Sequence, residues 1–216
     1  MEKRKVWDAP TRLFHWVIVG LVVFCWWTAE NDQLDLHRAG GITLAAFLIF
    51  RIYWGFVGSE TARFGNFLRG PKTVMAYVAA MRAGKAEAAP GHSPIGGWSV
   101  AAMLAATLGQ VTLGLFAVDV DGVESGPLSH LVSFSQGRFA AETHETLFNV
   151  LAALIALHIA AVAFYLIVAK KNLVGPMITG SAKTDADSKM APLWLALPGI
   201  VLAGGFAWAL ASGFRF

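Results

Sequence analysis

The 216-residue chain is 56% hydrophobic and 14% charged, with a mean hydropathy of +0.57 and a formal net charge of +3. This balance is far from that of water-soluble globular proteins and predicts an integral membrane protein. The one cysteine, Cys25, excludes an intrachain disulfide and says nothing about redox compartment.

Five apolar runs are long enough to cross a hydrocarbon core of about 30 Å. They cover approximately residues 13–30, 39–57, 98–118, 144–169 and 192–211. The first follows a basic N-terminus as a signal peptide would, but it is long, carries His15 and lacks a convincing cleavage site. We therefore expect it to be retained, which gives an all-α protein with five transmembrane helices.

The connections between these spans differ in character. Residues 71–82 have the apolar spacing and basic flanks of an amphipathic helix on the membrane surface, with docking of a cytoplasmic dehydrogenase as the alternative. Residues 83–92 are typical of a flexible linker, and residues 180–190 of a short polar connection. The long connection at 119–142 is expected to be a loop that covers the entrance to a cofactor site.

Positive charge is divided unequally between the two ends of the spans. Fourteen of the seventeen Lys and Arg residues fall on one side, while Arg38, Arg138 and Arg215 share the other side with eight of the acidic residues. Cytoplasmic loops retain positive charge, so we expect a cytoplasmic N-terminus, a periplasmic C-terminus and a place in the bacterial inner membrane. The cytoplasmic side then carries about +8 and the outer side about −5.

Four histidines fall at two depths in this arrangement. His144 and His158 are 14 residues apart, which on one helix leaves their side chains about 40° apart in azimuth and about 21 Å apart along the axis. His37 begins the second span on the outer side, and His15 lies at the cytoplasmic start of the first. The predicted pairs are His37 with His144 outside and His15 with His158 inside.

A pair of neutral imidazoles from two helices, with an apolar slot between them, is what a six-coordinate b haem requires. Ionisable residues inside a span are costly and usually mark a ligand or a pathway. Glycines allow close approach of a porphyrin edge or another helix, and the candidates are Gly20, Gly40, Gly41, Gly109 and Gly114. Cations near each surface can hold haem propionates, namely Arg12, Arg51 and Arg63 inside and Arg38 outside.

Two stacked haems would carry electrons across the membrane, and a quinone is the expected membrane-soluble donor or acceptor. A buried amide such as Gln110 or Asn149 can hydrogen-bond a quinone carbonyl, although either can equally join two helices. We expect contacts with membrane lipid and no nucleic-acid partner.

Several segments resemble the bacterial cytochrome b561 family. They are Val6-Trp-Asp-Ala-Pro-Thr-Arg-Leu-Phe-His-Trp16, His37-Arg-Ala-Gly-Gly41, Arg51-Ile-Tyr-Trp-Gly-Phe-Val-Gly58 and the helix of His144 and His158. The family includes b-type cytochrome subunits of nickel-iron hydrogenases and superoxide oxidase, and is similar to the gamma subunit of formate dehydrogenase. The resemblance covers residues 6–178 and implies a four-helix bundle with two b haems and a quinone site near one of them.

The resemblance divides the chain into a di-haem domain at 1–178 and an additional part at 179–216, whose transmembrane helix departs from the four-helix members. We expect that helix to contact a partner subunit or another copy of the chain. The implied function is electron relay between the quinone pool and a periplasmic or membrane redox protein, such as a cytochrome c, a hydrogenase or another dehydrogenase subunit. The alternative is a self-contained superoxide:quinone oxidoreductase, which the acidic outer face disfavours by repelling the anion.

Other interpretations of the histidines remain open. A single membrane histidine is more often a packing or gating residue, and histidines also build ion pathways in transporters, but no inverted repeat is visible here. A zinc protease is disfavoured because His144-Glu145 lacks the second histidine of the His-Glu-x-x-His motif.

Overall fold

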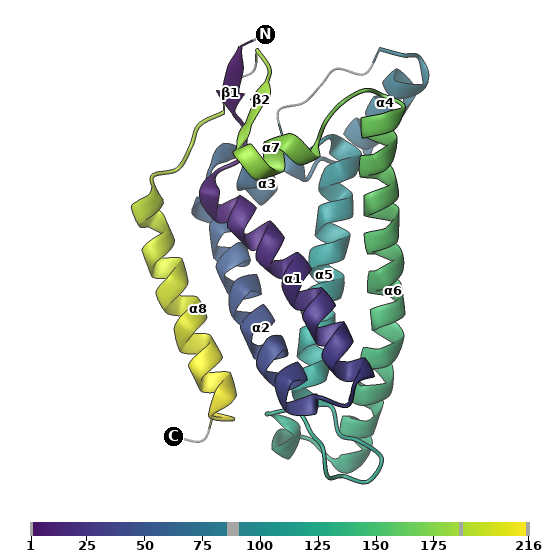
Figure 1. Ribbon diagram of the computed structural model, residues 1–216, viewed down its shortest axis with the longest axis vertical. Helices are drawn as coiled ribbons and strands as arrows, with labels where there is room; N and C mark the ends of the chain where they lie inside the picture. The colour runs from purple at the N-terminus through teal and green to yellow at the C-terminus, as the bar shows by residue number, and fades with distance from the viewer. Residues whose placement is uncertain (1, 86–90, 186–187, 215–216) are drawn as a thin grey trace. The chain divides into compact units, whose positions relative to one another are not determined.

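The protein is mostly helical, and a computed structural model describes residues 2–85, 91–185 and 188–214 (Figure 1). Within this part of the chain, five helical segments are long and apolar enough to cross a membrane. They are α1 (Ala9–Glu30), α2 (Leu34–Val57), α5 (Pro94–Phe116), α6 (Phe134–Ile167) and the segment Leu193–Ala211, which contains α8 (Ala196–Ala211). The five predicted spans are confirmed.

The start of α6 departs most from the sequence-based prediction. Residues 134–142 are helical, so the expectation that the outer loop continues to residue 142 is wrong. A capping box begins the helix, because the Ser133 amide donates to Gln136 Oε1 at 2.9 Å and the Gln136 amide donates to Ser133 Oγ at 3.3 Å. The loop between α5 and α6 is therefore limited to residues 117–133.

The described chain forms two compact units, which are considered separately. Unit 1 comprises residues 1–13, 52–103 and 154–197, and unit 2 comprises residues 14–51, 104–153 and 198–216. Each long helix contributes residues to both units.

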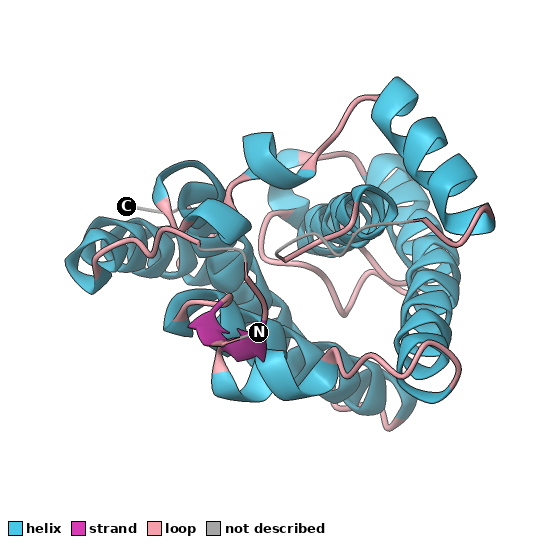
Figure 2. Cartoon of the chain, turned by 90° about the horizontal axis from the view of Figure 1, so that it is seen from above, coloured by secondary structure: helices cyan, strands magenta, loops and turns pink. Residues whose placement is uncertain are grey.

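Unit 2 contains the 3₁₀ turn Ser129–Leu131, and unit 1 contains the other short elements. They are β1 (Lys3–Lys5), α3 (Phe64–Phe67), α4 (Pro71–Arg82), α7 (Val174–Thr179), β2 (Ser181–Lys183) and the 3₁₀ turns Glu60–Ala62 and Leu193–Leu195. The predicted amphipathic helix at 71–82 is confirmed as α4, whereas residues 86–90 of the predicted linker lie outside the described residues. The connection at 180–190 was not expected to contain a strand, yet β2 pairs antiparallel with β1 (Figure 2).

Asp8 connects the start of α1 to α2 inside unit 1. Its carboxylate is 7% exposed and accepts hydrogen bonds from the Thr11 amide at 2.7 Å and from Trp54 Nε1 at 3.0 Å. The first of these bonds satisfies one of the amides at the helix N-terminus, which have no partner within the helix. The second satisfies the indole of a fully buried tryptophan.

Replacing Asp8 should therefore destabilise the protein strongly. Asp8→Ala removes a helix cap and the carboxylate oxygen to which the buried Trp54 Nε1 donates, so we expect a loss of about 2–4 kcal/mol of unfolding free energy. The measurement is the thermal unfolding midpoint in detergent, with Asp121→Ala as the matched control because Asp121 is exposed. An equal fall in both variants would contradict the assigned role of Asp8.

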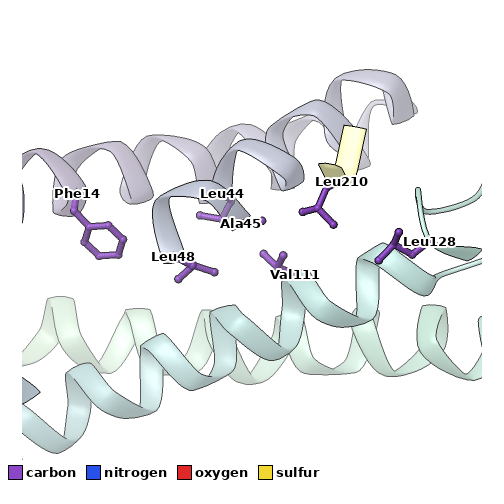
Figure 3. Close-up of a cluster of buried hydrophobic side chains, with 7 residues drawn as sticks. All are labelled: Phe14, Leu44, Ala45, Leu48, Val111, Leu128 and Leu210. Atoms are coloured by element: carbon purple, nitrogen blue, oxygen red, sulfur yellow. The ribbon is translucent and has the colours of Figure 1, made fainter. Parts of the chain in front are cut away.

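Unit 2 has the larger apolar core, which joins α1, α2, α5, α8 and the loop before α6 (Figure 3). The core residues are Phe14, Leu44, Ala45, Leu48, Val111, Leu128 and Leu210. Leu128 reaches this core because the loop folds back over the end of α5. There the Gly126 amide donates to the Ala117 carbonyl and the Leu128 amide donates to the Leu115 carbonyl, both at 2.8 Å. The fifth helix is thus an integral part of unit 2.

Candidate functional site

Unit 2 brings together His37, in the first turns of α2, and His144, in α6. Their ring centroids are 6.0 Å apart and their planes are inclined at 80°. Imidazoles bind divalent metals with bonds of about 2.0–2.1 Å, so two ligands on opposite sides of one metal have ring centroids about 6 Å apart. The separation therefore fits a single metal ion held between the two rings.

The second nitrogen of each ring has a main-chain partner. His37 Nδ1 lies 2.8 Å from the carbonyl oxygen of Cys25, and His144 Nδ1 lies 2.8 Å from the carbonyl oxygen of Gln110. A carbonyl only accepts, so each Nδ1 carries the proton and each Nε2 keeps its lone pair for a metal. Histidine ligands in proteins are commonly fixed in this way.

Glycines allow the close approach that this arrangement needs. A Cβ on Gly114 of α5 would lie 3.0 Å from Cε1 and 3.2 Å from Nδ1 of His144. A Cβ on Gly40 would lie 2.7 Å from Cys25 Sγ, so α1 and α2 approach closely where the Cys25 carbonyl meets His37. Gly109 is similarly close to Leu147, whereas Gly20 and Gly41 face open space.

The predicted inner ligands belong to different units. His15 lies in unit 2 and packs edge-on against Trp16, with centroids 4.8 Å apart. His158 lies in unit 1 and is half-buried on α6. Each residue is placed only within its own unit, so their pairing remains a prediction.

The four predicted propionate partners have different environments. Arg51 is 3% exposed, with its guanidinium 6.0 Å from the centre of the Phe14 ring. Arg12 donates to the Ile178 carbonyl, and Arg63 donates to the Gly58 carbonyl at 2.7 Å.

Arg38 pairs with two carboxylates of unit 2. One Nη atom donates to Asp35, and the other donates to Glu124 at 2.6 Å and to the Ser125 carbonyl at 3.2 Å. A propionate at Arg38 would have to replace one of these partners.

Gln110 is 8% exposed, and its side-chain Oε1 is buried without a hydrogen-bond donor among the described residues. Its main-chain carbonyl is the group that orients His144. The side chain of Asn149 is exposed and hydrogen-bonds only weakly, at 3.4 Å, to the Glu145 carbonyl. Of the two candidate amides, only Gln110 is buried beside the histidine pair.

The main-chain partners of the histidines have no signal in the sequence. Cys25 and Gln110 contribute carbonyl groups, which every residue type possesses, so no side-chain pattern reveals them. In the described part of the chain, no group of three or more His, Cys, Asp and Glu side chains is arranged to hold a metal. Of the predicted ligands, the structure brings His37 and His144 together as a pair.

One of the comparisons with known proteins gave a match. A family model described as prokaryotic cytochrome b561 matches residues 6–180. No curated protein and no solved structure matches the chain. The matched region contains all four predicted histidine ligands and ends before α8.

Proposed function

The chain belongs to the prokaryotic cytochrome b561 family, and we propose that it holds two b haems and relays electrons between the quinone pool and a separate redox protein. Family membership makes it a multi-pass membrane b-type cytochrome that takes part in electron transfer. The observation that carries the proposal is the His37/His144 pair, with rings 6.0 Å apart and both Nδ1 atoms bound to carbonyls.

The outer haem would be held by Nε2 of His37 and His144. A haem bound there supplies reversible one-electron chemistry at its iron. The carbonyls of Cys25 and Gln110 would fix the tautomer and the orientation of both rings. Gln110, whose side-chain Oε1 is buried without a hydrogen-bond donor among the described residues, would offer its amide to the carbonyl of a quinone bound near this haem.

The inner haem would be held by His15 and His158. His158 follows His144 by 14 residues on the continuous helix α6, so the two ligand positions are about 21 Å apart along it. Two cofactors at these depths give electrons a path across the membrane. The propionates of the two haems would meet Arg12, Arg51 and Arg63 on one side and Arg38 on the other, by charge-assisted hydrogen bonds.

Charge supports an orientation and a kind of partner. Thirteen of the seventeen Lys and Arg residues belong to unit 1, which would face the cytoplasm, whereas unit 2 contains eight acidic residues and four basic ones. An acidic periplasmic surface attracts a basic redox protein such as a cytochrome c and repels superoxide. We therefore favour relay over the superoxide:quinone oxidoreductase alternative.

The division proposed for the chain is a di-haem domain at 1–178 and an additional part at 179–216. The protein partner would be a cytochrome c or, as the alternative, a hydrogenase or another dehydrogenase subunit. The partner at the other end of the relay would be a quinone. The described part of α8 contributes Leu210 to the core of unit 2, so the additional part supports the di-haem domain in that unit.

The test is haem content and reactivity of the purified protein. We expect two haems per chain by pyridine haemochrome, reduction by a short-chain quinol, and little reduction by superoxide in the absence of a partner protein. A colourless preparation would contradict the proposal that the chain binds haem. Rapid haem reduction by superoxide alone would contradict the relay function and support the superoxide:quinone oxidoreductase alternative.

A further inference from the structure

The surface of unit 1 around α4 carries positive charge without acidic neighbours in the sequence. Residues 61–85 contain five Lys and Arg residues and no Asp or Glu, and the stretch 165–179 after them contains Lys170 and Lys171 and again no acidic residue. Arg63 donates to the Gly58 carbonyl. The other six cations are exposed, and none forms an ion pair with a described residue: Arg69, Lys72, Arg82, Lys85, Lys170 and Lys171. We call these six residues the basic patch.

Two contacts hold α4 beside the ends of two transmembrane helices (Figure 1). Trp98, near the start of α5, donates from its indole nitrogen to the Arg69 carbonyl at 2.8 Å, just before α4 begins. Tyr77, in the middle of α4, hydrogen-bonds to Tyr165, two residues before the end of α6. Trp and Tyr side chains concentrate where membrane helices meet the lipid head groups. Both contacts therefore indicate that α4 lies at head-group level.

The exposed face of α4 combines charge with one large apolar side chain. Residues around Tyr77 are half-buried, and the exposed stripe, at helical spacing, comprises Lys72, Met75, Ala79 and Arg82. Met75 is 72% exposed. Lys72 and Arg82 lie five residues, about 8 Å along the helix axis, on either side of Tyr77. Cations at both ends of a stripe with an apolar centre suit the boundary between lipid phosphates and acyl chains.

The end of α6 shows the same change from apolar to basic. Leu166, Ile167 and Val168 are 45%, 64% and 63% exposed, and Lys170 and Lys171 follow them. Large apolar side chains exposed at the end of a span meet acyl chains, and basic residues just beyond it lie near the lipid phosphates. An acidic soluble protein would pair with the lysines but leave the apolar residues uncovered. The pattern thus favours a lipid as the occupant.

We propose that the basic patch binds the head group of an anionic phospholipid. The Lys and Arg side chains of α4, Lys170 and Lys171 hold the phosphate, and an acyl chain lies along residues 166–168. Clusters of Lys and Arg at a membrane surface attract anionic lipids in this way. The site requires neither haem nor a redox partner, and it gives α4 a lipid ligand in place of the cytoplasmic dehydrogenase considered for it above.

The test is native mass spectrometry of the full-length protein in detergent. The protein is titrated with dioleoylphosphatidylglycerol or dioleoylphosphatidylethanolamine, which have the same acyl chains and differ in head-group charge. We expect phosphatidylglycerol to bind about tenfold more tightly or better. Lys72→Gln/Arg82→Gln and Lys170→Gln/Lys171→Gln should each weaken its binding about 10- to 30-fold, because each removes two cations from the patch.

The matched control removes two cations from another part of unit 1. Lys3 and Lys183 are exposed and face each other in the β1–β2 pair, so Lys3→Gln/Lys183→Gln makes the same change in net charge. This variant should bind phosphatidylglycerol as tightly as the parent.

The depth of α4 is measured separately with a nitroxide at position 75. Cys25→Ser/Met75→Cys leaves one thiol to label, because Cys25 is the one cysteine of the chain. In vesicles of the two lipids, the label should be more accessible to oxygen than to a water-soluble nickel complex. Cys25→Ser/Lys183→Cys, labelled on the exposed β2 strand, should show the opposite preference.

Several results would overturn the proposal. Equal binding of the two lipids would remove the preference for an anionic head group, and an equal loss in the Lys3→Gln/Lys183→Gln control would mean that overall charge, and not the basic patch, attracts the lipid. Displacement of phosphatidylglycerol by an equal concentration of inorganic phosphate would indicate a phosphate site without a lipid. A label at position 75 that is open to the nickel complex would place α4 in water and favour an acidic protein partner.

Discussion

His144→Leu is expected to remove one of two haems and to leave the other in place. Under the proposed pairing, the variant would lack one ligand of the outer haem, while His15 and His158 would still hold the inner one. Haem per chain by pyridine haemochrome should fall to about half, and a potentiometric titration should lose one of two components. His37→Leu should give the same result, because the two neighbouring rings are proposed to hold the same haem.

His130→Ala is a suitable control, since His130 is also in unit 2 but is not part of the pair. It should keep the full haem content. The double variant His37→Leu/His158→Leu should be colourless, because it removes one ligand from each site. Haem retained in that double variant, or an unaltered haem content in His144→Leu, would show that the pairing is wrong.

The positions of the five spans could be predicted because each depends on local composition. Runs of about 20 apolar residues have few alternatives to a membrane helix, and all five were confirmed. The amphipathic helix at 71–82 was predictable for a similar reason, because its periodicity and Pro71 at its first position are local signals.

The start of α6 differs from the sequence-based prediction although the sequence contains a signal for it. Ser133 and Gln136 have the spacing of a capping box, but the polar residues between them and the apolar run favour a loop. The pairing of β1 with β2 had no comparable signal. Each strand has three residues, too few for an alternating pattern, and their partners are about 180 positions apart in the chain.

For the candidate site, the sequence supplied the histidines and their depths but not the way in which their rings are fixed. The separation of His144 and His158 along α6 follows from helix geometry. The unequal distribution of Lys and Arg predicts that His37 lies on the same side as His144. The structure brings His37 and His144 together. The positions of the Cys25 and Gln110 carbonyls and the close approach of Gly126 to α5 depend on how the helices and the loop pack, which a single sequence does not encode in a local pattern.

Gly114→Leu is expected to impair the outer haem site without removing a ligand. A Cβ at this position already lies 3.0 Å from Cε1 of His144, and the remaining atoms of a leucine side chain must displace the ring or α5. Overpacking of this kind typically costs about 1–3 kcal/mol. Because the strain acts on the ligand, the outer haem should bind about 10- to 100-fold more weakly, and its reduction potential should shift.

A graded series separates steric displacement from helix propensity. Gly114→Ala should shift the potential of one haem while retaining both, because only a Cβ is added, whereas Gly114→Leu should lose the outer haem on dilution. Gly204→Ala and Gly204→Leu are the matched controls, since a Cβ there meets nothing within 4 Å. Alanine also favours a helix over glycine by about 1 kcal/mol, so the Gly204 variants should be as stable as the parent or more so. Normal haem affinity and potentials in Gly114→Leu would mean that the His144 ring does not depend on the space left by Gly114, and the proposed cofactor geometry would fail with it.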